Sequence, residues 1–120
     1  MSTMQPVRTV NIRGKAYVDV AERVRLTHAA GGYSIVSSEL VTIPAAPERL
    51  WARVTIQVGD RQFVGTAEAK LSARPGTADG DSPVECAETS ALGRALGFAG
   101  FGLVHSIASA DEVARNTFHR

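Results

Sequence analysis

SPVECAETSALGRALGFAGFG, residues 82–102, is the part of this sequence that decides the fold. Its first residues predict the start of a helix, because Ser82 and Glu85 form a Ser-x-x-Glu capping box and Pro83 suits the first helical position. Alanines then recur every four residues, at positions 87, 91, 95 and 99. A face of small side chains lets a helix lie close against a sheet or a neighbouring subunit.

Arg94 is the only basic residue of this predicted helix. A guanidinium in the C-terminal half of a helix interacts favourably with the helix dipole, and it also binds phosphate through a forked pair of hydrogen bonds. Spacing alone favours the dipole interpretation, and both interpretations stay open at this point.

The composition predicts one domain over residues 1–120, since the chain is 44% hydrophobic and has 120 residues. We expect residues 1–6 and 116–120 to be mobile. Cys86 is the single cysteine, which excludes an internal disulfide framework, and we interpret it as a small buried side chain. The first residues lack the apolar region of a secretory signal, and no apolar run approaches the ~20 residues of a membrane span. These features predict a cytoplasmic protein with no membrane partner.

The net charge is only +1, but the charges are unevenly placed along the chain. Residues 1–30 carry a surplus of three positive charges, and residues 76–112 carry a surplus of five negative charges. Such a split steers an anionic polymer to one edge or attracts subunits head to tail, and it also fits an ordinary solvated surface.

Three segments read as strands, and capping boxes mark two further helices. The middle strand has the clearest pattern, with Leu50, Ala52, Val54, Ile56 and Val58 on one face. In the next strand small residues such as Gly65 and Ala67 leave room for a closely docked helix. The expected elements are a leading strand with a basic turn in 7–18, a helix from Asp19 to Gly31 with His28 at the edge of the core, strands 33–43, 50–58 and 62–71, a flexible loop 72–81, and a short helix from Ser109 to about Phe118.

This order predicts an α+β fold. Its core is a three-stranded antiparallel sheet packed against a long C-terminal helix, in β-β-β-α order. Whether the leading strand joins this sheet as an extra strand is left open by the sequence.

Motifs of the common catalytic and cofactor sites are not found. There is no phosphate-binding loop, because Gly14-Lys15 is followed by alanine, and the glycines at 97, 100 and 102 end a helix rather than join a strand to one. The three histidines have no metal-ligand spacing with Cys86, and Asp79-Gly80-Asp81 lacks the acidic spacing of a calcium loop. We therefore expect neither an enzyme nor a bound cofactor or metal.

Three stretches resemble one family. They are ETSALGRALGFAGFG at 88–102, IRGK at 12–15 running into YVDVAE at 17–22, and VGTAE at 64–68. Together they are similar to the single-strand annealing recombination proteins, the Rad fifty-two group with its phage relatives such as Erf. The resemblance covers nearly the whole chain from Ile12.

The resemblance implies a ring or helical homo-oligomer that holds single-stranded DNA in a basic groove and anneals complementary strands in recombination and repair without ATP. A recombination nuclease or a single-strand-binding protein is an implied partner. Arg13 and Lys15 match the family's basic turn, and Arg94 matches the cation of its Leu-x-Arg-Ala-Leu helix, which favours the phosphate interpretation. Tyr17 is a candidate for stacking on a base. Cations of the strands and the following loop complete the candidate set: Arg53, Arg61, Lys70 and Arg74.

Two other classes of function stay open. A small α+β assembly or protein-interaction module would use the alanine face for subunit packing and would show no salt-dependent DNA binding. The other class is an enzyme with a pocket between sheet and helix, but none of the residues indicates such an enzyme.

Overall fold

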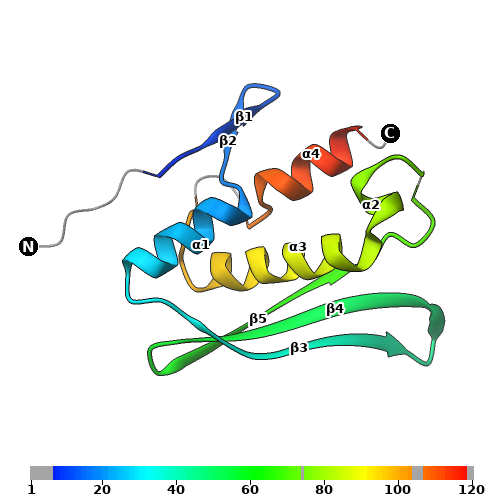
Figure 1. Ribbon diagram of the computed structural model, residues 1–120, viewed down its shortest axis with the longest axis horizontal. Helices are drawn as coiled ribbons and strands as arrows, with labels where there is room; N and C mark the ends of the chain where they lie inside the picture. The colour runs from blue at the N-terminus through cyan, green and yellow to red at the C-terminus, as the bar shows by residue number, and fades with distance from the viewer. Residues whose placement is uncertain (1–6, 74, 104–106, 119–120) are drawn as a thin grey trace, which may run out of the picture.

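The computed structural model describes residues 7–73, 75–103 and 107–118. We expected residues 1–6 and 116–120 to be mobile. Of these, residues 1–6 and 119–120 lie outside the described part, whereas residues 116–118 belong to the last helix, which extends to Phe118. The elements in chain order are β1 (Val10–Ile12), β2 (Lys15–Tyr17), α1 (Val20–Ala29), β3 (Ser34–Ile43), β4 (Ala46–Val58), β5 (Arg61–Glu68), α2 (Ala78–Asp81), α3 (Pro83–Phe98) and α4 (Ala110–Phe118) (Figure 1).

The main sheet confirms the predicted α+β class and the three antiparallel strands. Its order is β3-β4-β5, with Ile35 opposite Ile56 and Gly65 opposite Val54. The alternation in β4 is the predicted one, because Ala52, Val54 and Ile56 are buried under the helices. The leading segment does not join this sheet. Instead, β1 and β2 pair with each other in a separate two-stranded sheet.

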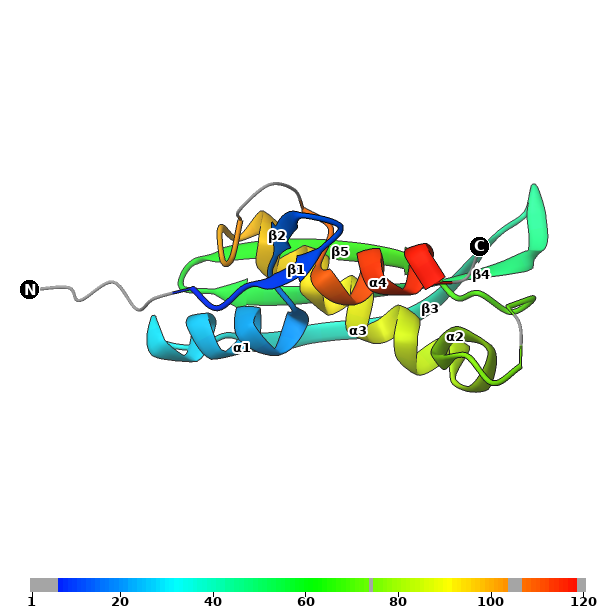
Figure 2. The same ribbon diagram turned by 90° about the horizontal axis from the view of Figure 1, so that it is seen from above.

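Helix α3 lies directly on β4 and β5, and its alanines form the centre of the core (Figure 1). The close docking expected from the small residues is confirmed at Gly65, where a Cβ atom would overlap the carbonyl oxygen of Ala91. Ala91, Ala95 and Leu96 are fully buried. Seen from above, the β1–β2 hairpin and α4 lie over α3 (Figure 2), which gives the molecule a further layer above the sheet and α3.

The prediction that this helix is C-terminal was wrong. Helix α3 ends at Phe98 in mid-chain, and α4 follows it. The predicted cap was also wrong: Ser82 makes no side-chain cap bond, because it closes α2 as well and its backbone (φ −142°, ψ 63°) is not that of a regular N-cap. Pro83 does occupy the first turn. The predicted loop at 72–81 contains α2, where the Thr77 side chain accepts from the Gly80 amide.

The start of α1 and the start of α4 are joined by hydrogen bonds between residues far apart in sequence. The Val20 amide donates to Asp111 Oδ1 at 2.8 Å, and the Ala110 amide donates to the Val18 carbonyl at 2.8 Å. The predicted Asp19 cap of α1 is confirmed by its bond from the Glu22 amide. His28 is exposed and stands 5.6 Å from the ring of Tyr33, so its predicted place at the core edge was wrong.

Within the described part of the chain, no helix is both long enough and apolar enough to cross a membrane.

Candidate nucleic-acid interface

The basic turn is the tip of the β1–β2 hairpin, which projects from the body of the molecule (Figure 1). Arg13 and Gly14 both have positive φ values, +52° and +82°, as a tight two-residue hairpin turn requires. The Asn11 side chain accepts from the Gly14 amide at 3.0 Å and stabilises the turn. An arginine costs roughly 1–2 kcal/mol in this backbone region, so the turn holds a cation where Asn or Asp would be easier to accommodate. Arg13 and Lys15 are both exposed.

A shallow apolar cavity of about 570 Å³ lies between β1 of this hairpin and α4. Val10 and Ile12 line it from β1, and Ala110 and Ala114 line it from α4. Arg13 stands on its lining, so the tip cation and the apolar surface are neighbours. Tyr17, the stacking candidate, is half-buried and pairs with Val10 across the hairpin.

Arg94 makes a contact that the sequence did not indicate. Its Nε atom donates to Glu112 Oε1 of α4 at 3.0 Å, so the ion pair links α3 to α4. The Glu112 side chain is 9% exposed and the Arg94 side chain is 40% exposed. A buried carboxylate therefore holds the Nε side of a guanidinium whose side chain remains partly exposed.

Lys70 lies with Arg94 on the lining of a small polar cavity of about 100 Å³. The same cavity is lined by the carboxylates of Glu68, Asp79 and Glu112. Two cations against three carboxylates do not make a positive cavity, so the charges of this lining disfavour an anion inside it. Cys86, predicted to be buried, is half-buried on this lining.

The first turn of α4 separates the two cavities. Asp111 lines the one at the hairpin, and its neighbour Glu112 lines the one at Arg94. The structure thus places Arg13, Lys15 and Tyr17 on one side of this turn and Arg94 with Lys70 on the other.

The candidates on the sheet lie elsewhere. Arg53 is on the face of β4 away from the helices and pairs with Glu39 at 3.0 Å. Arg61 begins β5 and is exposed. Arg74 lies outside the described residues.

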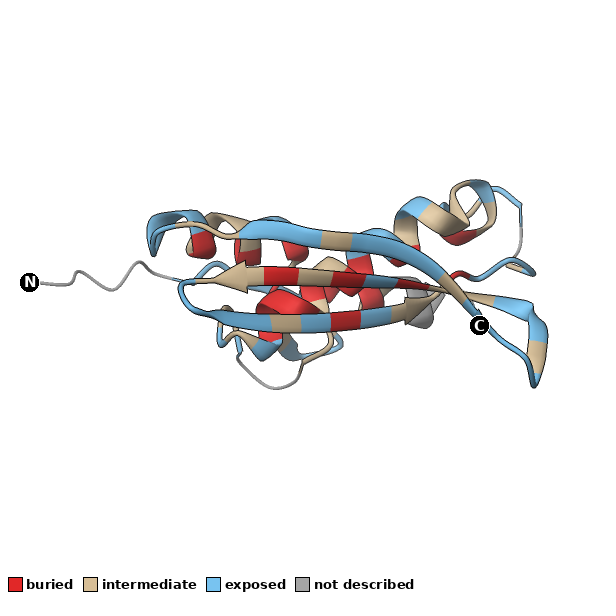
Figure 3. Ribbon diagram, turned by 90° about the horizontal axis from the view of Figure 1, so that it is seen from below, coloured by how far each residue is buried: buried red, intermediate tan, exposed pale blue. Residues whose placement is uncertain are grey.

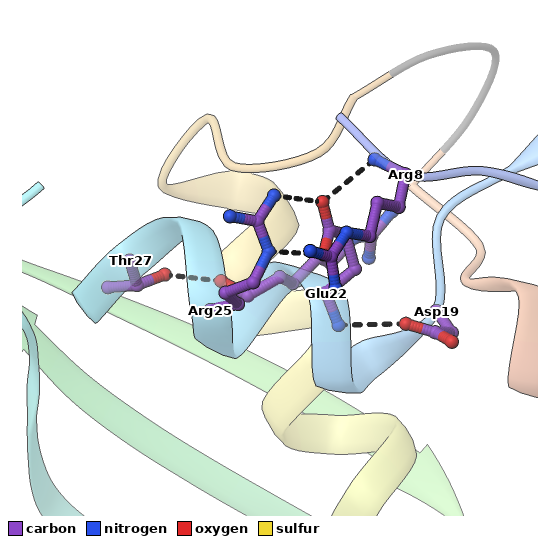
Figure 4. Close-up of polar contacts among 6 residues, drawn as sticks. Arg8, Asp19, Glu22, Arg25 and Thr27 are labelled. Carbon is purple, nitrogen blue, oxygen red and sulfur yellow. Dashed lines mark hydrogen bonds and ion pairs between the residues drawn. The ribbon is translucent and has the colours of Figure 1, made fainter. Parts of the chain in front are cut away.

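Two arginine–glutamate pairs also neutralise cations that are not among the candidates. Arg49 donates to both carboxylate oxygens of Glu68, at 2.7 and 2.8 Å, and lies 4.9 Å from the Trp51 ring centre. These hydrogen bonds lower the pKa of Glu68. In α1, Arg25 donates to Glu22, which also accepts from the Arg8 amide (Figure 4). The bond from Arg25 is the main cause that lowers the pKa of Glu22 to about 2.

No family model, curated protein or solved structure matches this chain.

Arg23 and Glu112 are the important side chains that sequence reasoning missed. Arg23 is 1% exposed, and its Nη1 atom donates to the carbonyls of Gly93 and Ile107 at 2.8 Å each. Burial lowers its pKa from the usual value. The sequence does contain a signal for the burial of Arg23. It is three residues after Val20 and four before Thr27 on the buried face of α1, and Gly97 in α3 leaves room for its side chain. Among the described residues no His, Cys, Asp or Glu cluster is arranged to hold a metal ion.

Proposed function

We propose that this protein binds single-stranded DNA and anneals complementary strands without ATP, as a ring or helical homo-oligomer acting in recombination and repair. The observation that carries the proposal is the exposed Arg13-Gly14-Lys15 turn at the tip of a separate hairpin. In addition, the sequence resembles single-strand annealing proteins in this turn and in the helix that contains Arg94.

The charges support binding to a phosphate backbone rather than to bases. Arg13 and Lys15 are exposed and, among the described residues, form none of the ion pairs that engage Arg25, Arg49 and Arg53. Contacts made through phosphates leave the bases available to a complementary strand, and neutralised phosphates repel that strand less.

Several copies are needed for this mechanism. One chain with a net charge of +1 offers few unpaired cations, whereas an assembly that repeats the same turn lines a groove with many of them. The apolar cavity beside Arg13 gives a base a surface to rest against, and Tyr17 is the aromatic residue of the same hairpin.

The test is an annealing assay with two complementary dye-labelled oligonucleotides, purified protein and no nucleotide triphosphate. We expect pairing to be strongly faster than the spontaneous rate at near-stoichiometric protein. The proposal would be wrong if the folded protein neither accelerated pairing nor bound single strands at low salt.

A second candidate function is an assembly or protein-interaction module without nucleic-acid activity. The exposed apolar side chains of β3 favour it, because large side chains in one edge strand mark an interaction surface. Self-association with no salt-dependent DNA binding would support this second function.

A further inference from the structure

Strand β3 is the most exposed element of the main sheet. Seen from below, β4 and β5 carry buried residues while β3 is exposed along nearly all its length (Figure 3). Four of its ten residues are large hydrophobics that are about half exposed: Ile35 (51%), Val36 (50%), Leu40 (51%) and Ile43 (47%). Large exposed apolar side chains gathered in one element mark a candidate interaction surface.

Two of these side chains point to the helical side of the sheet. Ile35 pairs with buried Ile56, and Leu40 pairs with buried Ala52, and residues opposite each other in an antiparallel ladder share a face. Val36 lies at a register shift, so it falls outside this alternation. We call Ile35 and Leu40 the β3 ledge.

The ledge is open because α3 is displaced toward the other edge. Helix α3 lies over β4 and β5, and it reaches β3 through the Ser38 hydroxyl, which donates to Glu88 at 3.4 Å. The side chains that would be covered by a centred helix therefore keep half of their surface in solvent.

Natural edge strands are protected against pairing by charged side chains, prolines or bulges. Strand β3 has register shifts at Val36 and between Val41 and Ile43, but it lacks the lysines and prolines that block a further strand. In β3, SIVSSELVTI, there is no Lys, Arg or Pro, and the single charge is Glu39. Ten residues at ~3.3 Å each give ~33 Å of edge.

The opposite edge of the sheet fits this one. Strand β5 is the other edge strand in the order β3-β4-β5, and α3 packs against it. The charges are complementary, because Glu88 lies beside β3, where it accepts from Ser38, while exposed Arg61 begins β5 and exposed Lys70 follows it. Glu39 of β3 is already paired with Arg53. A neighbour that offers β5 to β3 also brings its own α3 beside the ledge.

We infer that β3 of one copy pairs with β5 of a second copy, head to tail, and that the neighbour's α3 side covers Ile35 and Leu40. Because the two surfaces differ, each copy keeps one of each free, and the contact repeats into a ring or a filament. This inference names the self-interface of the oligomer in the proposed function and so rests on it.

The experiment measures the mass distribution of the full chain by light scattering and native mass spectrometry, without DNA. Leu40→Glu places a charge in the ledge and should weaken association at least tenfold. Leu103→Glu is the matched control, because Leu103 is 50% exposed but follows α3 and belongs to neither β3 nor β5. We expect the parent and Leu103→Glu to form species larger than two copies, and Leu40→Glu to be mainly monomeric and folded by circular dichroism.

Three results would overturn the inference: a parent that stays monomeric at high concentration, a parent that stops at two copies, or a folded Leu40→Glu variant with the parent's masses. Ile35→Glu is the second variant, and failure of both variants to fold would show that the ledge is not exposed. Single-strand binding is measured separately by anisotropy. A protein that assembles as expected but binds no DNA leaves this interface standing and removes the proposed function.

Discussion

Gly65 of β5 lies directly against the Ala91 carbonyl of α3, so closely that a Cβ atom at position 65 would overlap it. The same atom would come within 2.6 Å of the Ala95 amide nitrogen. Both neighbours are backbone atoms of a helix, which no side-chain rotation can move. The distance between α3 and the sheet is therefore set at this residue.

Gly65→Ala should lower the free energy of unfolding by about 1–3 kcal/mol, because α3 has to shift to admit a methyl group. Urea titration followed by circular dichroism gives this value. Thr66→Ala changes the exposed neighbour and should leave stability within about 0.5 kcal/mol. Equal stability of the two variants would contradict the close contact.

Arg23→Met should cost about 2–5 kcal/mol, because it leaves the carbonyls of Gly93 and Ile107 without their shared donor. The apolar chain of methionine keeps most of the volume, so the loss reports the hydrogen bonds. Arg61→Met is the control, since Arg61 is exposed. Thermal unfolding that shifts by the same amount in both variants would count against a buried role for Arg23.

Acid should destabilise the protein between about pH 4.5 and pH 2 through Glu22. Its pKa falls from the usual 4.5 to about 2 in the folded state, so its stabilising contribution is complete above pH 4.5 and disappears as pH falls through 2. Unfolding measured from pH 7 to pH 2 should show a shallower acid loss in Glu22→Gln. Some slope should remain, since Arg49 also lowers the pKa of Glu68. A Glu22→Gln variant with the parent's full acid slope would refute the assignment.

Removal of both cations of the hairpin turn should weaken single-strand binding and reduce its salt dependence. Each phosphate contact contributes about 0.7 to the slope of log K against log salt for single strands, so Arg13→Ala with Lys15→Ala should lower the slope by about 1 to 1.5. Fluorescence anisotropy over a range of salt gives the slope. Arg53→Ala with Arg61→Ala removes two cations from the sheet and should change it less, because Arg53 is paired with Glu39. An unchanged slope in the folded hairpin variant would move the site elsewhere.

Arg94 and Glu112 allow the two roles of the arginine to be separated. If Arg94 contacts phosphate, Arg94→Ala weakens single-strand binding while Glu112→Gln keeps or strengthens it, because a competing carboxylate is gone. We expect this result, because the Arg94 side chain is 40% exposed while it is paired with Glu112. Equal loss of binding in both variants, with equal loss of stability, would mean that Arg94 serves only to hold α4.

The parts of the fold that sequence could predict are those that depend on local pattern. The alternation from Leu50 to Val58 specifies β4, and small residues at Gly65 and along α3 specify the close packing. Asp19 also caps its helix as expected. In contrast, Ser82 fails as a cap because the short helix α2 ends on the same residue, which a four-residue motif does not reveal.

The site was harder to predict because its contacts join distant residues. Arg94 could be selected as a cation, but its partner Glu112 is 18 positions away on another helix. Composition treats Arg23 as a surface charge, whereas Gly97 of α3 leaves the space in which Arg23 is buried. The hairpin cations needed no such contact, since a two-residue turn is local, and they are found exposed at its tip.

The bond from the Val20 amide to Asp111 closes a separation of 91 residues, the longest of the side-chain hydrogen bonds described here. The sheet and α3 can keep their own contacts when α4 detaches, so this closure is the natural place for partial opening. Deuterium uptake at Val20 would then follow the release of α4 rather than the melting of α1. A single amide near the start of the chain thus reports whether the far end is docked.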